Sequence, residues 1–257
     1  MPSPRAALAA LVIAASAFAA ALQPSALPGQ EGRPHDPWVF RSVLDGNARM
    51  LTAALHDDLW VAYDTQTGSL YKAWRGGVKF DGAVYTARHG PQPTSEGEAY
   101  VIAPPDSPWR YAVRPDQEAE QAEIATPEAH YLGHAVQDGR LVIRTRLAAA
   151  DGRTAVIAES PEFRETDGAV TLERRIRAEG DLVPDLVLLV PIGFLEREDA
   201  VLVAGVRDVT RRLTRPPQGL RNPAQAAQPI PLDPDDPVVI RMVFGTAAPS
   251  PAHEEDR

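Results

Sequence analysis

Residues 137–180 read QDGRLVIRTRLAAADGRTAVIAESPEFRETDGAVTLERRIRAEG, and this stretch decides the fold. It holds three Asp-Gly pairs, at Asp138, Asp151 and Asp167, and each pair lies between runs in which apolar and polar residues alternate. Asp-Gly is typical of tight β-hairpin turns, because glycine accepts the positive φ that these turns need, and a period of two is typical of half-buried strands. The stretch therefore predicts a meander of antiparallel strands.

The flanking sequence extends the same pattern. Asp45-Gly46 and Asp81-Gly82 predict two further hairpins. Three apolar runs, LVLLVP, AVLVAGV and VVIRMVF, are bounded by Pro or Gly and predict fully buried strands near the centre of a sheet. No window has the apolar period of a long amphipathic helix, and the Pro-rich residues 215–237 predict a long surface loop. We expect an all-β fold, an antiparallel β-sandwich with a hairpin meander.

The two ends of the chain differ in composition from its middle. Residues 1–22 place one arginine before an alanine-rich apolar run, which is typical of a secretory signal peptide. Residues 23–34 predict a linker, residues 35–246 a single β-sandwich domain, and residues 247–257 a disordered tail. We therefore expect a periplasmic or secreted protein with no membrane span after signal cleavage. An uncleaved anchor is the alternative that the length of the apolar run leaves open.

Composition narrows the classes of chemistry. The chain has no cysteine, so burial rather than disulfides must hold the fold. Its net charge of -9 comes with no basic stripe in the sequence, and we expect no nucleic-acid partner. The sequence also lacks a Gly-rich phosphate loop, a nucleophile elbow, a Cys motif and an H-E-x-x-H motif. We expect neither a metal nor a cofactor.

An aromatic and charged block lies between His35 and Tyr100. It contains three of the four tryptophans and four of the six tyrosines, together with both lysines. An aromatic face beside cations and carboxylates suits a sugar or polyol, which offers C–H faces to stack and hydroxyls to bond. The candidate ligand-binding residues are Arg41, Trp60, Tyr71, Lys72 and Trp74. The alternative interpretation makes the aromatic residues core and cross-strand pairs.

The same block contains candidates for acid–base chemistry. A His-Asp pair is the minimum for proton transfer, because the carboxylate fixes the tautomer of the imidazole and raises its basicity. The candidate catalytic residues are His56, Asp58, Asp81 and His89. The alternative for His56-Asp57-Asp58 is a polar turn between two strands.

Two other clusters allow both a functional and a structural interpretation. Residues 130–134, HYLGH, have a metal-like spacing, but the two histidine side chains would converge on one metal ion only in a helix. Because this segment leads into a strand, we favour histidines with a surface or structural role. Glu159 and Glu162 can form a carboxylate site with Arg174 and Arg175 on the following strand. A cross-strand ion-pair ladder is the favoured alternative.

Residues 34–100, PHDPWVFRSVLDGNARMLTAALHDDLWVAYDTQTGSLYKAWRGGVKFDGAVYTARHGPQPTSEGEAY, resemble the N-terminal module of large secreted proteins of Bacteroidota and planctomycete-type bacteria. In those proteins the module precedes a c-type cytochrome domain, sometimes with sugar-dehydrogenase-like or trehalose-utilisation-type domains in the same chain. The resemblance continues more weakly to residue 180. It implies a c-type cytochrome or a sugar-dehydrogenase-like protein as partner. Because this chain has no cysteine, it cannot attach haem through C-x-x-C-H. Either a separate cytochrome supplies electron transfer, or the module acts alone.

A second resemblance is at the level of pattern. The runs GRLVIRTRL, VIAESPEF and GAVTLERRI are similar to sugar-mutarotase-type supersandwich domains, in which a large β-sandwich presents a carbohydrate groove. Together, these features predict an exported β-sandwich module that binds a carbohydrate or polyol and acts with a separate cytochrome or sugar-processing partner. Two alternatives stay open: a sugar-ring epimerase or lyase that uses a His/Asp pair, and a non-catalytic docking scaffold for a cytochrome-bearing protein.

Overall fold

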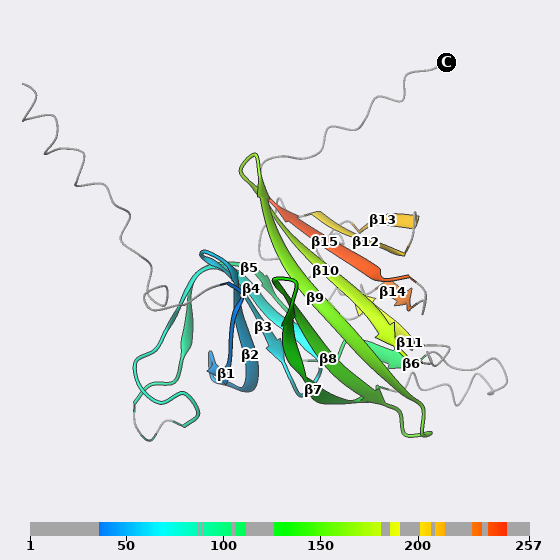
Figure 1. The fold of residues 1–257 in the computed structure, drawn as a ribbon, viewed down its shortest axis with the longest axis horizontal. Helices are drawn as coiled ribbons and strands as arrows, with labels where there is room; N and C mark the ends of the chain where they lie inside the picture. The colour runs from blue at the N-terminus through cyan, green and yellow to red at the C-terminus, as the bar shows by residue number, and fades with distance from the viewer. Residues whose placement is uncertain are drawn as a thin grey trace, which may run out of the picture.

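The computed structural model describes residues 36–86, 88, 90–103, 106–111, 126–180, 186–190, 201–206, 209–213, 228–232 and 236–245. Within these ranges the chain forms fifteen strands and no α-helix, and the strands build three antiparallel sheets (Figure 1). The all-β, antiparallel β-sandwich that the sequence predicts is confirmed. The predicted signal peptide, linker and tail all lie outside the described residues.

The aromatic and charged block folds as a five-stranded sheet in which each strand pairs with the next along the chain. Its strands are β1 (Trp38–Leu44), β2 (Asn47–His56), β3 (Leu59–Asp64), β4 (Ser69–Lys79) and β5 (Thr94–Ile102). The predicted turn at Asp45-Gly46 joins β1 to β2, with φ of 51° and 80° at its two residues. Asp81-Gly82 is not a hairpin turn, so that prediction is wrong: the pair lies in the longer connection between β4 and β5.

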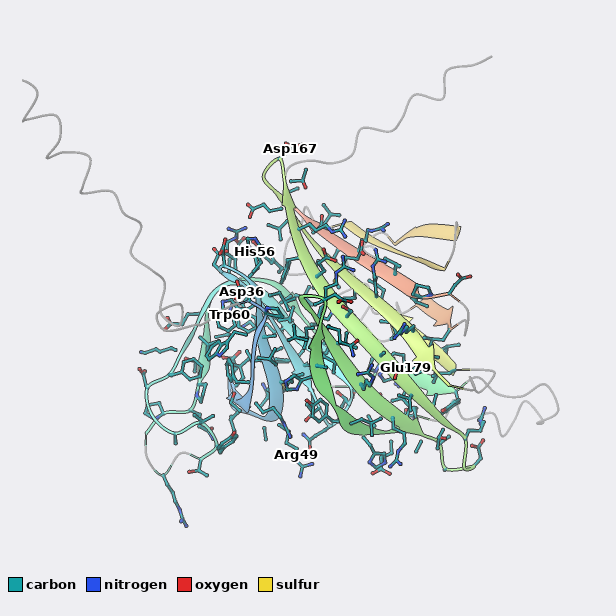
Figure 2. The ribbon with its side chains drawn as sticks, in the orientation of Figure 1. Asp36, Arg49, His56, Trp60, Asp167 and Glu179 are labelled. Atoms are coloured by element: carbon teal, nitrogen blue, oxygen red, sulfur yellow. The ribbon has the colours of Figure 1, made fainter. Side chains whose placement is uncertain are left out.

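A seven-stranded sheet holds the meander, in the order β13-β12-β15-β10-β9-β8-β7. The meander strands are β7 (Glu128–Gln137), β8 (Arg140–Ala148), β9 (Thr154–Thr166) and β10 (Ala169–Glu179), and the others are β12 (Val201–Val206), β13 (Val209–Leu213) and β15 (Val238–Phe244). All three predicted Asp-Gly turns join consecutive meander strands, and Figure 2 shows Asp167 at the tip of the β9–β10 hairpin. Residues 238–244 alternate between buried and more exposed positions, so β15 is central in the sheet but not buried on both faces.

The third sheet has three short strands in the order β14-β11-β6. They are β14 (Gln228–Pro231), β11 (Leu186–Val190) and β6 (Trp109–Tyr111). The apolar run LVLLV is its central strand, as predicted. For residues 228–231 the prediction of a surface loop is wrong, because QPIP forms an edge strand, where proline can pair on one side only.

All three sheets contribute to one main hydrophobic core. Leu51 and Val61 come from the five-stranded sheet, Leu172 and Ile240 from the seven-stranded sheet, and Trp109 from the three-stranded sheet. Each of these side chains is at most 1% exposed. Burial of one large apolar side chain contributes about 1.5–3 kcal/mol, so this shared core holds the layers together without disulfides.

A second, smaller core lies on the other face of the five-stranded sheet. Its buried members are Leu44, Met50, Ala54, Trp60, Ala62, Trp74 and Val78. This face is covered because the sheet curls. The backbone N–H of Val43 donates to Val84 O and that of Asp45 donates to Pro93 O, both at 3.1 Å, so the end of β1 meets the connection that leads to β5. β1 and β5 do not pair as a ladder, and the curled sheet does not close into a barrel.

Two glycines on neighbouring strands allow the curl. Gly76 of β4 and Gly97 of β5 are cross-strand partners with φ of 141° and 115°. A Cβ added to either would lie 2.0 Å from a carbonyl oxygen of the facing strand. Only glycine therefore lets the two backbones approach this closely.

Candidate functional site

The two tryptophans proposed from the sequence as a sugar-stacking surface lie inside the smaller core. Trp60 is 0% and Trp74 1% exposed, and their rings stack with centroids 5.9 Å apart and 16° between the planes. Each indole N–H also has an acceptor, because Trp60 donates to Gly76 O at 2.9 Å and Trp74 to Gly77 O at 3.0 Å. Neither ring has a free face for a ligand, and both support the curl.

Tyr71 and Lys72 surround the Asp45 carboxylate at the β1–β2 turn. The Asp45 carboxylate accepts hydrogen bonds from the backbone N–H and the hydroxyl of Ser95, both at 2.7 Å. Lys72 Nζ lies 3.3 Å and the Tyr71 hydroxyl 3.4 Å from Asp45 Oδ2. Burial and the charge of Asp45 raise the pKa of Tyr71. We name Asp45, Tyr71, Lys72 and Ser95 the Asp45 clasp, because these contacts fasten the turn to β4 and β5.

The candidate catalytic residues have separate partners. His56 is exposed, and its Nδ1 lies 3.3 Å from Asp57 Oδ2 within the β2–β3 turn. Asp58 accepts from Arg75 at 3.3 Å, and Asp81 lies 2.9 Å from Lys79 Nζ. His89 lies outside the described residues.

Among the described candidate residues, His56 therefore lies beside Asp57 and not beside the proposed partners Asp58 and Asp81. Within the described ranges, no hydrogen bond or ion pair joins His56 to Asp58 or Asp81. The contacts of His56-Asp57-Asp58 are those of a polar turn. The described part of the chain also contains no group of three or more His, Asp and Glu side chains that could hold a metal ion.

A buried carboxylate links the two large sheets. Arg174 of β10 donates to both oxygens of Glu159 on β9, at 2.6 and 3.0 Å, and Tyr63 of β3 donates to Glu159 Oε1 at 2.5 Å. The side chains of Arg174 and Glu159 are 7% and 6% exposed. Burial and the charge of Glu159 raise the pKa of Tyr63 well above its ordinary value. Glu159 and Arg174 are thus a cross-strand ion pair, but one that is buried against the opposite sheet.

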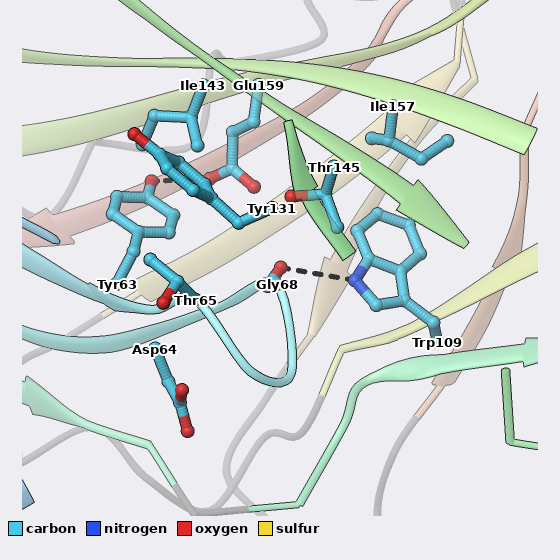
Figure 3. A pocket seen from close by; sticks show the side chains of 10 residues that line it. All are labelled: Tyr63, Asp64, Thr65, Gly68, Trp109, Tyr131, Ile143, Thr145, Ile157 and Glu159. Atoms are coloured by element: carbon cyan, nitrogen blue, oxygen red, sulfur yellow. Dashed lines mark hydrogen bonds between the residues drawn. The ribbon is translucent and has the colours of Figure 1, made fainter. Parts of the chain in front are cut away.

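A small cavity adjoins this buried ion pair. Figure 3 shows its lining side chains, which are those of Tyr63, Asp64, Thr65, Trp109, Tyr131, Ile143, Thr145, Ile157 and Glu159, together with Gly68. The space open to a water-sized sphere is about 10 Å³. That volume holds about one water molecule, so a sugar ring cannot enter.

A larger cavity of about 370 Å³ lies beside the β1–β2 hairpin. Its lining residues are Arg41, Ser42, Val43, Ala48, Arg49 and Tyr85, and we name it the Arg41–Tyr85 cavity. The β1–β2 register shifts between Ser42 and Leu44, and Arg49 has a φ of 59°, which is uncommon for a residue other than glycine. The irregular pairing places both arginines at this cavity. Its volume lies within the range of small-molecule sites, about 300–1,000 Å³.

The lining of the Arg41–Tyr85 cavity favours an anion. Among the described residues, Arg41 and Arg49 have no carboxylate partner, although the Arg41 guanidinium lies 5.1 Å from the centroid of the Tyr131 ring. Ser42 is 2% exposed, and its hydroxyl has no hydrogen-bond partner among the residues that the structure describes. Tyr85 is 69% exposed and offers an aromatic face. Two cations and an aromatic ring together suit a polar molecule that bears an acidic group.

Among the sequence candidates that the structure describes, Arg41 alone lines this cavity. The sequence did not point to Arg49, because nothing in residues 48–50, Ala-Arg-Met, predicts a left-handed backbone conformation within a strand. It also missed Tyr85, although this residue lies within the aromatic and charged block. What distinguishes Tyr85 from the other aromatic residues of the block is its exposed side chain, and exposure cannot be read from the sequence.

The HYLGH segment lies near the cavity but forms no metal pair. A register shift between Tyr131 and Gly133 lets the Tyr131 hydroxyl lie 2.6 Å from His134 Nδ1, while His130 lies 3.6 Å from Glu128. Burial and the nearby positive charge of Arg41 lower the pKa of His134. We assign His134 to the support of Tyr131, on whose ring Arg41 rests.

Comparison of the chain with protein-family models gives no match, and no curated protein matches it. Within the described ranges, no helix has the length and apolar character needed to cross a membrane.

Proposed function

We propose that the protein is an exported β-sandwich module that binds a carbohydrate or polyol carrying an acidic group, and that the ligand occupies the Arg41–Tyr85 cavity. The observation that carries the proposal is the pairing of a cavity of about 370 Å³ with two arginines that have no carboxylate partner in the part of the chain that the structure describes. A carboxylate accepts two parallel hydrogen bonds from one guanidinium, and a sugar ring stacks its C–H face on a tyrosine.

A docking scaffold is the second candidate function. The burial of Trp60 and Trp74 favours it, because aromatic residues that only fill a core leave the block without a stacking surface. Trp38 is half-buried, with its ring edge-on to Trp60 at 6.2 Å. The partner proposed from the resemblance is a c-type cytochrome or a sugar-dehydrogenase-like protein, and co-purification from the native host tests that proposal.

Calorimetric titration with short oligosaccharides tests the ligand proposal. We expect digalacturonate to bind and its neutral counterpart, a galactose disaccharide, to bind at least about tenfold more weakly, since a charged hydrogen-bonded pair is lost. Arg41→Gln, Arg49→Gln and Tyr85→Ala should each weaken binding of digalacturonate, whereas the exposed Arg88→Gln serves as the matched control. Equal binding of the acidic and neutral sugars would contradict the acidic ligand, and binding of neither would contradict the carbohydrate proposal.

A further inference from the structure

The outer face of the seven-stranded sheet is rich in arginine. This is the face that points away from the main core, and strand alternation places on it Arg140, Glu162, Arg144, Arg146, Arg164, Glu173, Arg175, Arg177, Glu179 and Arg241. We name these ten residues the arginine face. Every one of its arginines except the half-buried Arg144 is exposed. They come from four strands, so no run of the sequence is basic.

The glutamates of the arginine face are each shared by two arginines. Glu173 on β10 is 3% exposed, and its two oxygens accept from Arg175 and from Arg241 of β15, both at 2.7 Å. Arg241 is the direct cross-strand partner of Glu173. The same two-to-one arrangement recurs at Glu179 with Arg144 and Arg177, and at Glu162 with Arg140 and Arg164.

This arrangement leaves excess positive charge on one face of an acidic protein. Seven arginines against three glutamates give the arginine face a net charge of +4, whereas the chain as a whole carries -9. Glu128 of β7, whose cross-strand partner Ala148 lies on the same side of the sheet, lowers the sum on that side to +3. Arg146 has no ion-pair partner among the described residues. The glutamates also orient the guanidinium groups, which present five N–H donors each and so keep donors for a further anion.

We propose that the arginine face binds an anionic polysaccharide through its sulfate or carboxylate groups. Spaced charges on four neighbouring strands, which lie about 4.8 Å apart, suit an extended anion that makes several contacts at once. The described part of this face carries no Phe, Tyr or Trp side chain on which a base could stack, and apolar residues on it, such as Val142 and Val239, are small or β-branched. These features disfavour a nucleic acid and a protein interface. The proposal uses other residues than the Arg41–Tyr85 cavity and does not depend on it.

Binding of the full chain to heparin and to polygalacturonate, measured by calorimetry over a range of salt concentrations, tests this proposal. We expect at least one polymer to bind, and its affinity to fall steeply as salt rises, because an anionic polymer releases counterions on binding. The triple variant R146Q/R164Q/R177Q should bind at least about tenfold more weakly, since it loses three charge-assisted contacts. R88Q, which removes an exposed arginine elsewhere, should bind as the parent does.

Three outcomes would overturn the proposal: neither polymer binds, the triple variant binds unchanged, or a DNA duplex binds as tightly as the polysaccharides. Circular dichroism checks that the triple variant folds. If it does not, R146Q alone carries the test with an expected loss of about two- to threefold, because Arg146 makes no ion pair whose removal could disturb the fold. Polymer binding that persists in R41Q/R49Q separates this face from the cavity, whose own test uses disaccharides.

Discussion

The hydroxyl of Tyr63 donates a 2.5 Å hydrogen bond to Glu159 Oε1, across the interface between the two large sheets. Apolar packing sets how closely the sheets approach, whereas this bond also sets where one lies along the other, because it is directional. Arg174 neutralises the same carboxylate from the neighbouring strand. The sequence alone predicted the cross-strand ion pair between Glu159 and Arg174, but it did not predict that Tyr63 of the other sheet bonds to the same carboxylate.

Tyr63→Phe should lower the free energy of unfolding by about 1.5–3 kcal/mol, because a buried carboxylate loses a hydrogen-bond donor and nothing replaces it. Urea denaturation measures the change. Tyr85→Phe removes the same hydroxyl from an exposed ring and should change the free energy by less than about 0.5 kcal/mol. Equal effects of the two variants would show that the Tyr63–Glu159 bond contributes nothing specific.

Glu173 should make stability depend on pH in the acidic range. Burial raises the pKa of Glu173, but the hydrogen bonds and charges of Arg241 and Arg175 outweigh it and hold the pKa below the ordinary 4.5. A carboxyl whose pKa is lower in the folded state stabilises the fold above its unfolded pKa, and this stability is lost as pH falls through the folded pKa. Thermal unfolding of Glu173→Gln should therefore show a lower Tm than the parent near pH 7 and a gap that narrows below pH 4.5. Glu128→Gln, at an exposed position, is the control, and a gap independent of pH would contradict the prediction.

Asp45→Asn should loosen the curled sheet. The substitution removes the charge on which Lys72 and Ser95 converge, and it keeps a side chain that tolerates the φ of 51° at this turn. We expect a loss of about 1–3 kcal/mol in urea, with faster amide exchange in β1 and β5. Asp138→Asn, at another Asp-Gly hairpin with the same φ, makes a matched control. Similar losses in both variants would assign the effect to the turn and not to the clasp.

Gly76→Ala should be strongly destabilising, by about 3 kcal/mol or more, because the new Cβ would lie 2.0 Å from Glu96 O. Gly133→Ala is matched to it in backbone conformation, with φ of 139° against 141°, and has no atom within 4 Å of the added Cβ. The difference between their free energies of unfolding isolates the clash from the backbone strain, which alone costs on the order of 1–3 kcal/mol. Equal losses would show that β4 and β5 can separate at this point.

Turn chemistry made most of the fold predictable from the sequence. Asp138, Asp151 and Asp167 each lie in a turn between consecutive strands, because the Asp-Gly signal is local and depends on backbone conformation alone. Asp81-Gly82 carries the same signal, but no strand begins close enough behind it to pair. The short strand at residues 228–231 escaped prediction because an edge position tolerates the prolines that argue against a strand.

The candidate site was harder to predict, because burial depends on how the sheet bends. Trp60 and Trp74 alternate with smaller residues as a surface pair would, and only the curl at Gly76 and Gly97 encloses them. The arginine face escaped notice for a related reason. Arg241 meets Glu173 through the pairing of two strands that are 68 positions apart in the chain. The local sequence does not predict which residues become partners over such a separation.

The stacked rings of Trp60 and Trp74 give the molecule an optical property of its own. Two indoles held nearly parallel with centroids 5.9 Å apart couple their electronic transitions, and this coupling produces a paired band in the circular dichroism spectrum. Trp109 lies in the main core, and its ring is not stacked on another tryptophan among the described residues. Loss of the paired band therefore reports the opening of the curled sheet and not that of the main core.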